Sequence, residues 1–314
     1  RMVVKVNPEF GIELALAVPY AYYLHTQGKL ETVITSRGMK PFYYFCDDVR
    51  EEFDSRTIDN AAAGCDELPN NWIHGIDSVN HPGVLDYSQW ICPPYKEHYK
   101  NDEFTFNDKP IVFITNKYNL EHGNPPYGYF DIQCLYDIFE YLTGQGYAVV
   151  YKRATNRESN FTIDQNEMNT IIKGYHNITA EVEGLGVITD RELPRYMDDV
   201  WLLDDIPTNY SLNETQLKIM ANCDNYIAVC GGNSIMSSMF GGTVISYVHK
   251  GRELRPNYFC KDSYFRRLSN ANFIPVFDVI KKINEKTFHH KVNYTDKNDY
   301  TEFIETIKKN IIGV

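Results

Sequence analysis

A stretch of small and polar residues follows one of the most apolar runs of the chain. Residues 225–230 (NYIAVC) lead into Gly231, Gly232, Asn233 and Ser234, and a short segment with helical spacing comes next. Where a strand leads into a helix, the first backbone N–H groups have no partner within the helix and bind anions such as phosphate. Glycines allow the anion to approach the backbone closely. The stretch therefore predicts a phosphate-binding loop, although an ordinary tight turn capped by Asn233 or Ser234 would have the same sequence.

Charged and polar residues follow three further apolar runs. Asn116 and Lys117 follow the run IVFIT, Lys152 and Arg153 follow AVVY, and Glu253 comes shortly after TVISYV. Cationic side chains can neutralise a diphosphate. An acidic residue shortly after a strand can accept hydrogen bonds from the ribose hydroxyls of a nucleotide. Together with the glycine stretch, these residues predict a site for a nucleoside diphosphate; solvated strand ends and surface ion pairs are the alternatives.

Three side chains of the first 50 residues could act as a general base on a hydroxyl group. They are Glu13, Asp47 and His25. Glu13 is the first choice because it lies at the start of an expected helix, although a favourable charge in a first helical turn, worth about 0.3–1 kcal/mol, is the alternative. Asp47 follows the aromatic run FYYFC, which looks like a strand end.

The elements expected to position these residues alternate between strands and helices. Strands are expected at 3–6, 30–36, 42–48, 110–118, 148–155, 200–205, 225–232 and 243–251. Helices are expected at 11–25, 131–147, 213–223, 233–241 and 301–312. Such alternation implies right-handed crossovers and a parallel sheet. Ligands bind beyond the carboxyl ends of the strands in such sheets, so the residues directly after each apolar run are the site candidates.

A proline-rich crossing divides the chain into two parts. Residues 92–109, which include Pro93 and Pro94, separate an N-terminal α/β unit from a more regular C-terminal one. The expected domains are residues 1–108 and residues 109–300, with a terminal helix in 301–314 that packs back on the first domain. The fold class is therefore α/β, with two Rossmann-like domains facing a central cleft.

Composition and charge exclude several classes of protein. A net charge of −11 over 314 residues argues against a nucleic-acid partner, which usually requires a basic surface. The seven cysteines are scattered and form no CxxC pair, so neither a zinc site nor a disulfide framework is indicated. No stretch of about 18 apolar residues and no signal peptide is seen, which predicts a cytoplasmic chain without a transmembrane segment.

Two stretches resemble GT-B-fold glycosyltransferases. Their donor-binding part is similar to residues 223–253 (CDNYIAVCGGNSIMSSMFGGTVISYVHKGRE). Their N-terminal pattern is similar to residues 10–24 (FGIELALAVPYAYYL). The resemblance implies that Gly231 to Ser234 bind the pyrophosphate of a UDP- or GDP-sugar and that Glu253 binds the ribose. It further implies inverting transfer to a glycan or other hydroxyl acceptor, with a base from the first domain and no metal or other cofactor. The arginine-rich signature of fucosyltransferases and the E-x7-E of many retaining enzymes are absent, so the resemblance extends to no particular sugar-specific family.

Besides pyruvyl transfer or sugar epimerisation on a similar two-domain fold, two other functions remain open at this point. The first is a metal-dependent GT-A transferase, for which Asp47-Asp48, Asp198-Asp199 and Asp204-Asp205 would hold the metal, but none has the D-x-D form. The second is a non-catalytic protein of GT-B-like fold that binds a carbohydrate or a nucleotide. The absence of GxGxxG and GxxxxGK[ST] argues against a classical NAD site and a P-loop.

Overall fold

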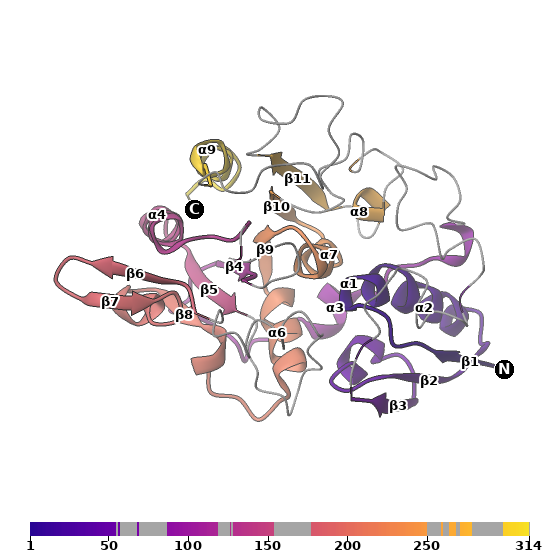
Figure 1. Cartoon of the computed structure of the whole chain (residues 1–314). Coiled ribbons are helices and arrows are strands. Elements are labelled where there is room, and N and C mark those ends of the chain that lie inside the picture. The colour runs from indigo at the N-terminus through magenta and orange to yellow at the C-terminus, as the bar shows by residue number, and fades with distance from the viewer. Residues whose placement is uncertain are drawn as a thin grey trace.

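Two parallel β-sheets and the helices that cover them make up most of the protein (Figure 1). The structure, a computed structural model, describes residues 1–54, 56, 68, 87–118, 126, 128–153, 177–249, 259, 264–267, 271–277 and 298–313. Within this part of the chain, the smaller sheet has the order β1-β2-β3, and the larger one has the order β11-β10-β9-β4-β5-β8. A separate antiparallel ribbon, β6-β7, projects from the side of the larger sheet. The expected α/β fold with parallel sheets is confirmed.

The smaller sheet is built from the first 53 residues. Its strands are β1 (Met2–Lys5), β2 (Leu30–Ser36) and β3 (Asp48–Phe53). The helical segment between β1 and β2 consists of α1 (Phe10–Ile12), a π-helical turn (Glu13–Ala17) and α2 (Val18–Thr26). Pro19 has no N–H for the carbonyl oxygen of Ala15, and the indole Nε1–H of Trp90 donates to that oxygen at 2.7 Å. Trp90, just before the crossing at residues 92–109, therefore completes the hydrogen bonding of the first helical segment.

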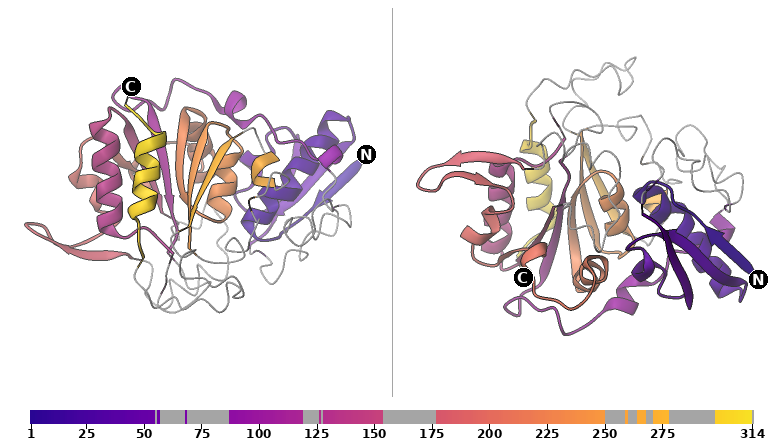
Figure 2. Two further views of the ribbon diagram at one scale, coloured as in Figure 1. Left: turned by 90° about the horizontal axis from the view of Figure 1, so that it is seen from above. Right: turned by 60° about the horizontal axis from the view of Figure 1, so that its bottom comes forward.

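The larger sheet is buried on both faces. Its strands are β4 (Ile111–Asn116), β5 (Ala148–Arg153), β8 (Val200–Leu202), β9 (Cys223–Val229), β10 (Thr243–Val248) and β11 (Asn272–Phe277). Helices α4 (Ile132–Gly144) and α9 (Thr301–Asn310) lie side by side on one face, and α6 (Leu212–Ala221) and α7 (Gly232–Ser238) lie on the other (Figure 2). Cover on both faces explains why these strands are almost continuously apolar rather than alternating.

The strand order of the larger sheet reverses between β4 and β9. From β4 the chain moves outward to β5 and β8, and it then returns to β9 on the other side of β4 and continues to β10 and β11. Because all these pairings are parallel, the carboxyl ends of β4 and β9 lie next to each other. This reversal is the switch point at which open α/β sheets bind their ligands.

A single hydrophobic cluster extends from the smaller sheet to one face of the larger one. It includes Leu14 and Phe42 from the first part of the chain, Tyr95 of α3 (Tyr95–Tyr99), and Met236 and Phe240 beside β9. The two sheets therefore share a core. The central cleft and the domain boundary at residue 108 stay predictions.

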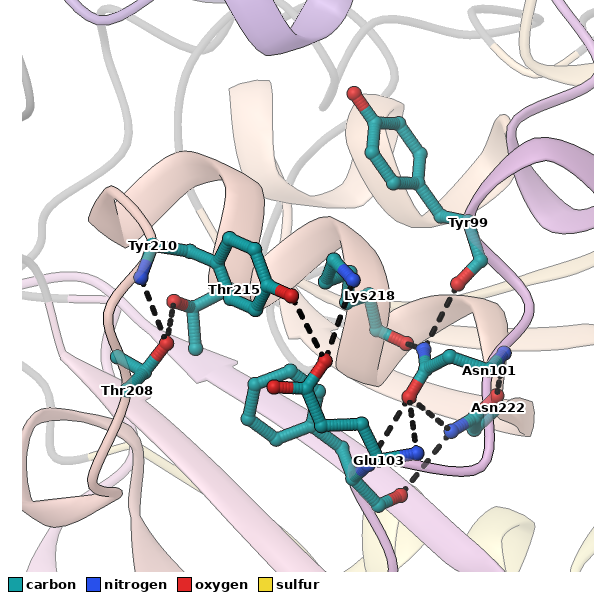
Figure 3. A network of polar contacts seen from close by, with 9 residues as sticks. Tyr99, Asn101, Glu103, Thr208, Tyr210, Thr215, Lys218 and Asn222 are labelled. Carbon is teal, nitrogen blue, oxygen red and sulfur yellow. Dashed lines mark hydrogen bonds and ion pairs between the residues drawn. The ribbon is translucent and has the colours of Figure 1, made fainter.

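The crossing between the sheets is held against α6 by a network of polar contacts (Figure 3). The Asn101 side chain donates to the carbonyl oxygen of Lys218 at 2.9 Å and accepts the N–H groups of Glu103 at 3.1 Å and Phe104 at 2.9 Å. The Asn222 side chain donates to the carbonyl oxygen of Phe104 at 3.1 Å. The network fixes the path of the chain just before it enters β4.

We expect Asn101→Ala to lower the free energy of unfolding by about 2 kcal/mol, because the backbone N–H groups of Glu103 and Phe104 and the carbonyl oxygens of Tyr99 and Lys218 each lose a hydrogen-bond partner. Urea unfolding measures the change. Asn310→Ala is the matched control, since this exposed asparagine makes one bond, to the carbonyl oxygen of Thr306 at 2.8 Å, and we expect its loss to cost less than about 0.5 kcal/mol. Equal effects of the two substitutions would contradict the role of the network.

Three expectations about the elements are wrong. The run at 42–48 is not a strand, because Lys40–Tyr43 forms a 3-10 helix with Pro41 in its first turn, and Phe42 and Tyr43 are both fully buried instead of pointing to opposite faces. Strands β6 (Thr179–Val182), β7 (Gly186–Thr189) and β11 were not expected. The terminal helix α9 packs on α4, β10 and β11 rather than on residues 1–108.

Candidate functional site

The candidate site lies at the carboxyl ends of β4, β5 and β9. Lys152, at the end of β5, donates through Nζ to Oδ1 of Asn233 at 3.0 Å. Since β4 lies between β5 and β9, this hydrogen bond crosses the switch point. Only 5% of Lys152 is exposed, so its ammonium group is held under the start of α7. The structure therefore brings together two of the predicted donor-binding residues that are far apart in sequence.

The glycine stretch forms a loop that presents backbone donors. Gly231 has a φ of 140° and a ψ of −157°, a conformation that is essentially limited to glycine. Its N–H donates to Oγ of Ser234 at 3.1 Å, so Ser234 acts as a cap. The N–H groups of Gly232 and Asn233 have no hydrogen-bond acceptor among the residues that the structure describes. Two adjacent backbone donors with this geometry are suited to an anion.

Arg153 lies beside a buried carboxylate that the sequence analysis missed. Its Nη1 is 3.4 Å from Oδ2 of Asp190, and both side chains are almost fully buried. The hydroxyl of Tyr151 donates to the same carboxylate oxygen at 2.6 Å, and burial together with the Asp190 charge raises the pKa of Tyr151. Burial and the neighbouring charge of Arg153 lower the pKa of Arg191. The charges of Asp190 and Asp204 act in the opposite direction on Arg191, so two guanidinium groups and two carboxylates lie close together in this corner of the site.

Asn116 is the last residue of β4 and Lys117 directly follows it, as expected, but the Asn116 side chain has a structural role. Its Nδ2 donates to the carbonyl oxygen of Phe130 at 2.9 Å, and its Oδ1 accepts the N–H of Phe130 at 3.0 Å. These bonds tie the end of β4 to the start of the segment that leads into α4. Half-buried Tyr118 follows, with the Arg153 guanidinium 5.6 Å from the centre of its ring. Glu253, the predicted ribose ligand, lies outside the described residues.

Glu13 is buried beside the smaller sheet. It forms an ion pair with Arg56, and its Oε1 accepts the hydroxyl of Tyr43 at 2.9 Å and that of Thr35. Burial and the Glu13 charge raise the pKa of Tyr43. Arg56 also donates to the carbonyl oxygen of Pro8 at 2.9 Å, so this pair holds the loop that follows β1. The role of Glu13 as a base stays a prediction.

Asp47 and His25 lie at the opposite edge of the smaller sheet from Glu13. Asp47 directly precedes β3 and therefore marks the beginning of a strand and not its end. His25 lies in the last turn of α2, which runs antiparallel to the strands. The chain after α2 lies near the start of β1, because the N–H of Met2 donates to the carbonyl oxygen of Lys29 at 2.7 Å. Both side chains are exposed. The structure does not bring them together with Glu13, and their catalytic role stays a prediction.

The carboxyl edges of the two sheets meet at a pair of glycines. A Cβ atom added to Gly11 would lie 3.1 Å from the Cα of Gly232, and one added to Gly232 would lie 3.3 Å from the backbone nitrogen of Gly11. Any side chain at either position would push the two backbones apart. The start of the first helical segment and the glycine loop after β9 are therefore in direct backbone contact.

Within the described ranges, no three histidine, cysteine, aspartate or glutamate side chains come together in a way that could hold a metal ion. None of the helices found there is long and apolar enough to cross a bilayer. In each of the three aspartate pairs considered for a metal, one aspartate forms an ion pair with a cationic side chain. Asp48 Oδ2 lies 2.8 Å from Arg50 Nη2, and Asp205 Oδ2 lies 2.9 Å from Arg195 Nε. Asp199 forms an ion pair with Lys109.

No family model and no curated protein matches the sequence. Among solved structures, the chain is similar to a glycosyl transferase family 9 protein from Veillonella parvula, with a TM-score of 0.35 and 12% identity over 93% of this chain and 76% of that one. It is also similar to TibC from enterotoxigenic E. coli, an iron-containing dodecameric glycosyltransferase, with a TM-score of 0.37 and 13% identity over 78% of this chain and 59% of that one. At these TM-scores neither likeness supports a functional statement about this chain.

Proposed function

We propose that this protein is a glycosyltransferase of the GT-B type, which binds a nucleoside-diphosphate sugar at the carboxyl ends of β4, β5 and β9. The observation that carries the proposal is the hydrogen bond between Lys152 and Asn233 across the switch point of the larger sheet. It places a buried cation beside a glycine loop in which the N–H groups of Gly232 and Asn233 have no acceptor among the described residues. This combination matches the charge and the hydrogen-bonding needs of a diphosphate.

Each donor-binding residue has a distinct task in this proposal. The N–H groups of Gly232 and Asn233 bind diphosphate oxygens, and Gly231 gives the loop its shape. Lys152, Arg153 and Lys117 supply the positive charge that stabilises the leaving nucleoside diphosphate, so that no metal is needed. Glu253 accepts the ribose hydroxyls of a UDP or GDP moiety.

The transfer is an inverting displacement. A carboxylate on the smaller sheet takes the proton of the acceptor hydroxyl, whose oxygen attacks the anomeric carbon. The bond between that carbon and the diphosphate oxygen breaks, and the electron pair leaves on the nucleoside diphosphate. The acceptor is a glycan or another molecule with an accessible hydroxyl group.

Nucleotide binding by the purified chain tests the site directly. We expect UDP or GDP to bind in calorimetric titrations without Mn²⁺, and Lys152→Ala to weaken this binding about 10- to 100-fold, because hydrogen bonds to charged groups contribute about 1.5–3 kcal/mol. Lys109→Ala is the matched control, since Lys109 precedes β4 at the opposite edge of the sheet and pairs with Asp199. Binding that needs Mn²⁺ would favour a metal-dependent transferase, and equal affinities of wild type and Lys152→Ala would show that the diphosphate binds elsewhere.

One observation favours a second candidate, a non-catalytic nucleotide-binding protein of the same fold. Two of the three predicted bases, Asp47 and His25, lie at the edge of the smaller sheet that faces away from the glycine loop, and the third, Glu13, is buried. A binding protein would hold UDP or GDP but release none from sugar nucleotides. Measuring nucleotide release alongside binding separates the two functions.

A further inference from the structure

We propose that Glu9 is the general base of the transfer and that Glu13 is a positioning residue. This inference rests on the proposed function, and it names a residue that the sequence analysis did not consider. Glu9 lies between the end of β1 and the start of α1, at the carboxyl edge of the smaller sheet. It is half-buried, whereas Glu13 is fully buried.

The Glu9 carboxylate lies next to the glycine loop after β9. Its Oε2 lies 3.2 Å from the point that a Cβ on Gly11 would occupy, and the Cα of Gly232 lies 3.1 Å from the same point. The carboxylate and the glycine loop therefore border the same place, where the two sheets meet. A sugar attached to a diphosphate on Gly232 and Asn233 would have its anomeric carbon within a few bonds of that loop.

The backbone N–H of Ile12 holds the Glu9 carboxylate in place. Oε2 accepts the N–H of Ile12 at 3.2 Å, so the side chain caps the first helical turn. The same contact fixes the direction in which the carboxylate points.

Glu13 is linked through Arg56 to the loop that carries Glu9. Both of its oxygens have partners inside the protein: Tyr43 and Thr35 for one, Arg56 for the other. Arg56 in turn donates to the carbonyl oxygen of Pro8, the residue directly before Glu9. Glu13 therefore acts on the reaction through Arg56 and the loop that carries Glu9.

In the reaction, one carboxylate oxygen of Glu9 takes the proton of the acceptor hydroxyl as the new bond between oxygen and anomeric carbon forms. The bond from that carbon to the diphosphate breaks at the same time, and its electron pair leaves on the nucleoside diphosphate. The proton on Glu9 passes to water after the product leaves, which restores the carboxylate.

Glu9→Gln tests the proposal because the amide oxygen can still accept the Ile12 N–H but the side chain cannot take up a proton. The assay follows release of UDP or GDP from a panel of UDP- and GDP-hexoses, with water in place of the acceptor, next to calorimetric Kd values for UDP and GDP. We expect kcat to fall about 10²- to 10⁴-fold, with the nucleotide Kd and the Tm close to those of wild type. Glu302→Gln, which changes an exposed acid in the first turn of α9, is the matched control and keeps wild-type kcat.

Glu13→Gln completes the comparison, since it removes the ion pair but leaves an oxygen for Tyr43 and Thr35. We expect its Tm to fall, and the kcat of the folded fraction to fall less than tenfold with the pH profile unchanged. Wild-type kcat in Glu9→Gln, or a loss of nucleotide affinity instead of kcat, would overturn the role of Glu9. A wild-type chain that binds UDP or GDP but releases neither from any donor would also overturn it, whereas a chain that binds no nucleotide would refute the proposed function itself.

Discussion

Arg56→Met is expected to lower the free energy of unfolding by about 3–5 kcal/mol, because it leaves the Glu13 carboxylate without its cation in a buried position. The side chains of Arg56 and Glu13 are 1% and 0% exposed. An ionised carboxylate that loses its partner there has neither water nor another described cation to compensate for its charge. Methionine keeps much of the volume of arginine, so the change mainly removes charge and hydrogen bonds.

Urea unfolding of three variants separates this effect from a general loss of packing. The double variant Glu13→Gln/Arg56→Met is expected to regain most of the lost stability, since no unpaired buried charge remains. Arg37→Met is the matched control: Arg37 pairs with Asp54 on the same sheet, but the two side chains are 48% and 80% exposed, and such pairs contribute at most about 1 kcal/mol. A loss in Arg56→Met no larger than that in Arg37→Met would show that the pair is not desolvated.

Gly242→Ala is expected to lower the free energy of unfolding by about 3 kcal/mol, from the combined cost of a left-handed backbone and of steric overlap. Gly242 has a φ of 68° in the turn between α7 and β10. A Cβ atom there would lie much closer to the carbonyl oxygen of Asp224, at the beginning of β9, than van der Waals contact allows. Because both partners are backbone atoms, neither can move without disturbing the pairing of β9 with β10.

Gly28→Ala is the matched control for this prediction. Gly28 has a nearly identical φ of 64° at the end of α2, but a Cβ added to it would meet no atom within 4 Å. We expect a cost of about 1 kcal/mol, which is the backbone contribution alone. Chemical denaturation of both variants measures the difference, and equal losses would mean that the turn before β10 relaxes around the new methyl group.

The secondary structure was largely predictable from residues that are neighbours in the sequence. The boundaries of β2 agree with the expected 30–36, and α4 lies within the expected 131–147. Helix α6 begins one residue before the expected range 213–223 and ends within it. These elements have long apolar patterns, and a few local residues determine where they end. The strand expected at 42–48 was wrong because aromatic residues, which fill this run, are common in strands. Pro41 and the burial of Phe42 and Tyr43 instead favour a 3-10 helix.

Residues of the site were predictable only to the extent that they directly follow a strand. Lys152, Arg153 and the glycine stretch were found in this way. Asp190 and Arg191 were missed because they follow β7, a four-residue strand of an antiparallel ribbon with little apolar pattern. Glu9 was missed because its significance comes from its distance to a loop more than 200 residues later in the chain.

The amino-acid sequence by itself determined the alternation of strands and helices, the parallel sheets and the enrichment of polar residues at the carboxyl ends of strands, since these follow from local periodicity and turn chemistry. Only the tertiary structure decided the strand order that places Lys152 opposite Asn233, 81 residues away. It also decided that Glu13 is buried with Arg56 while Glu9 lies at the meeting point of the sheets. Such pairings depend on how whole sheets pack against each other, and no pattern within a single segment encodes them.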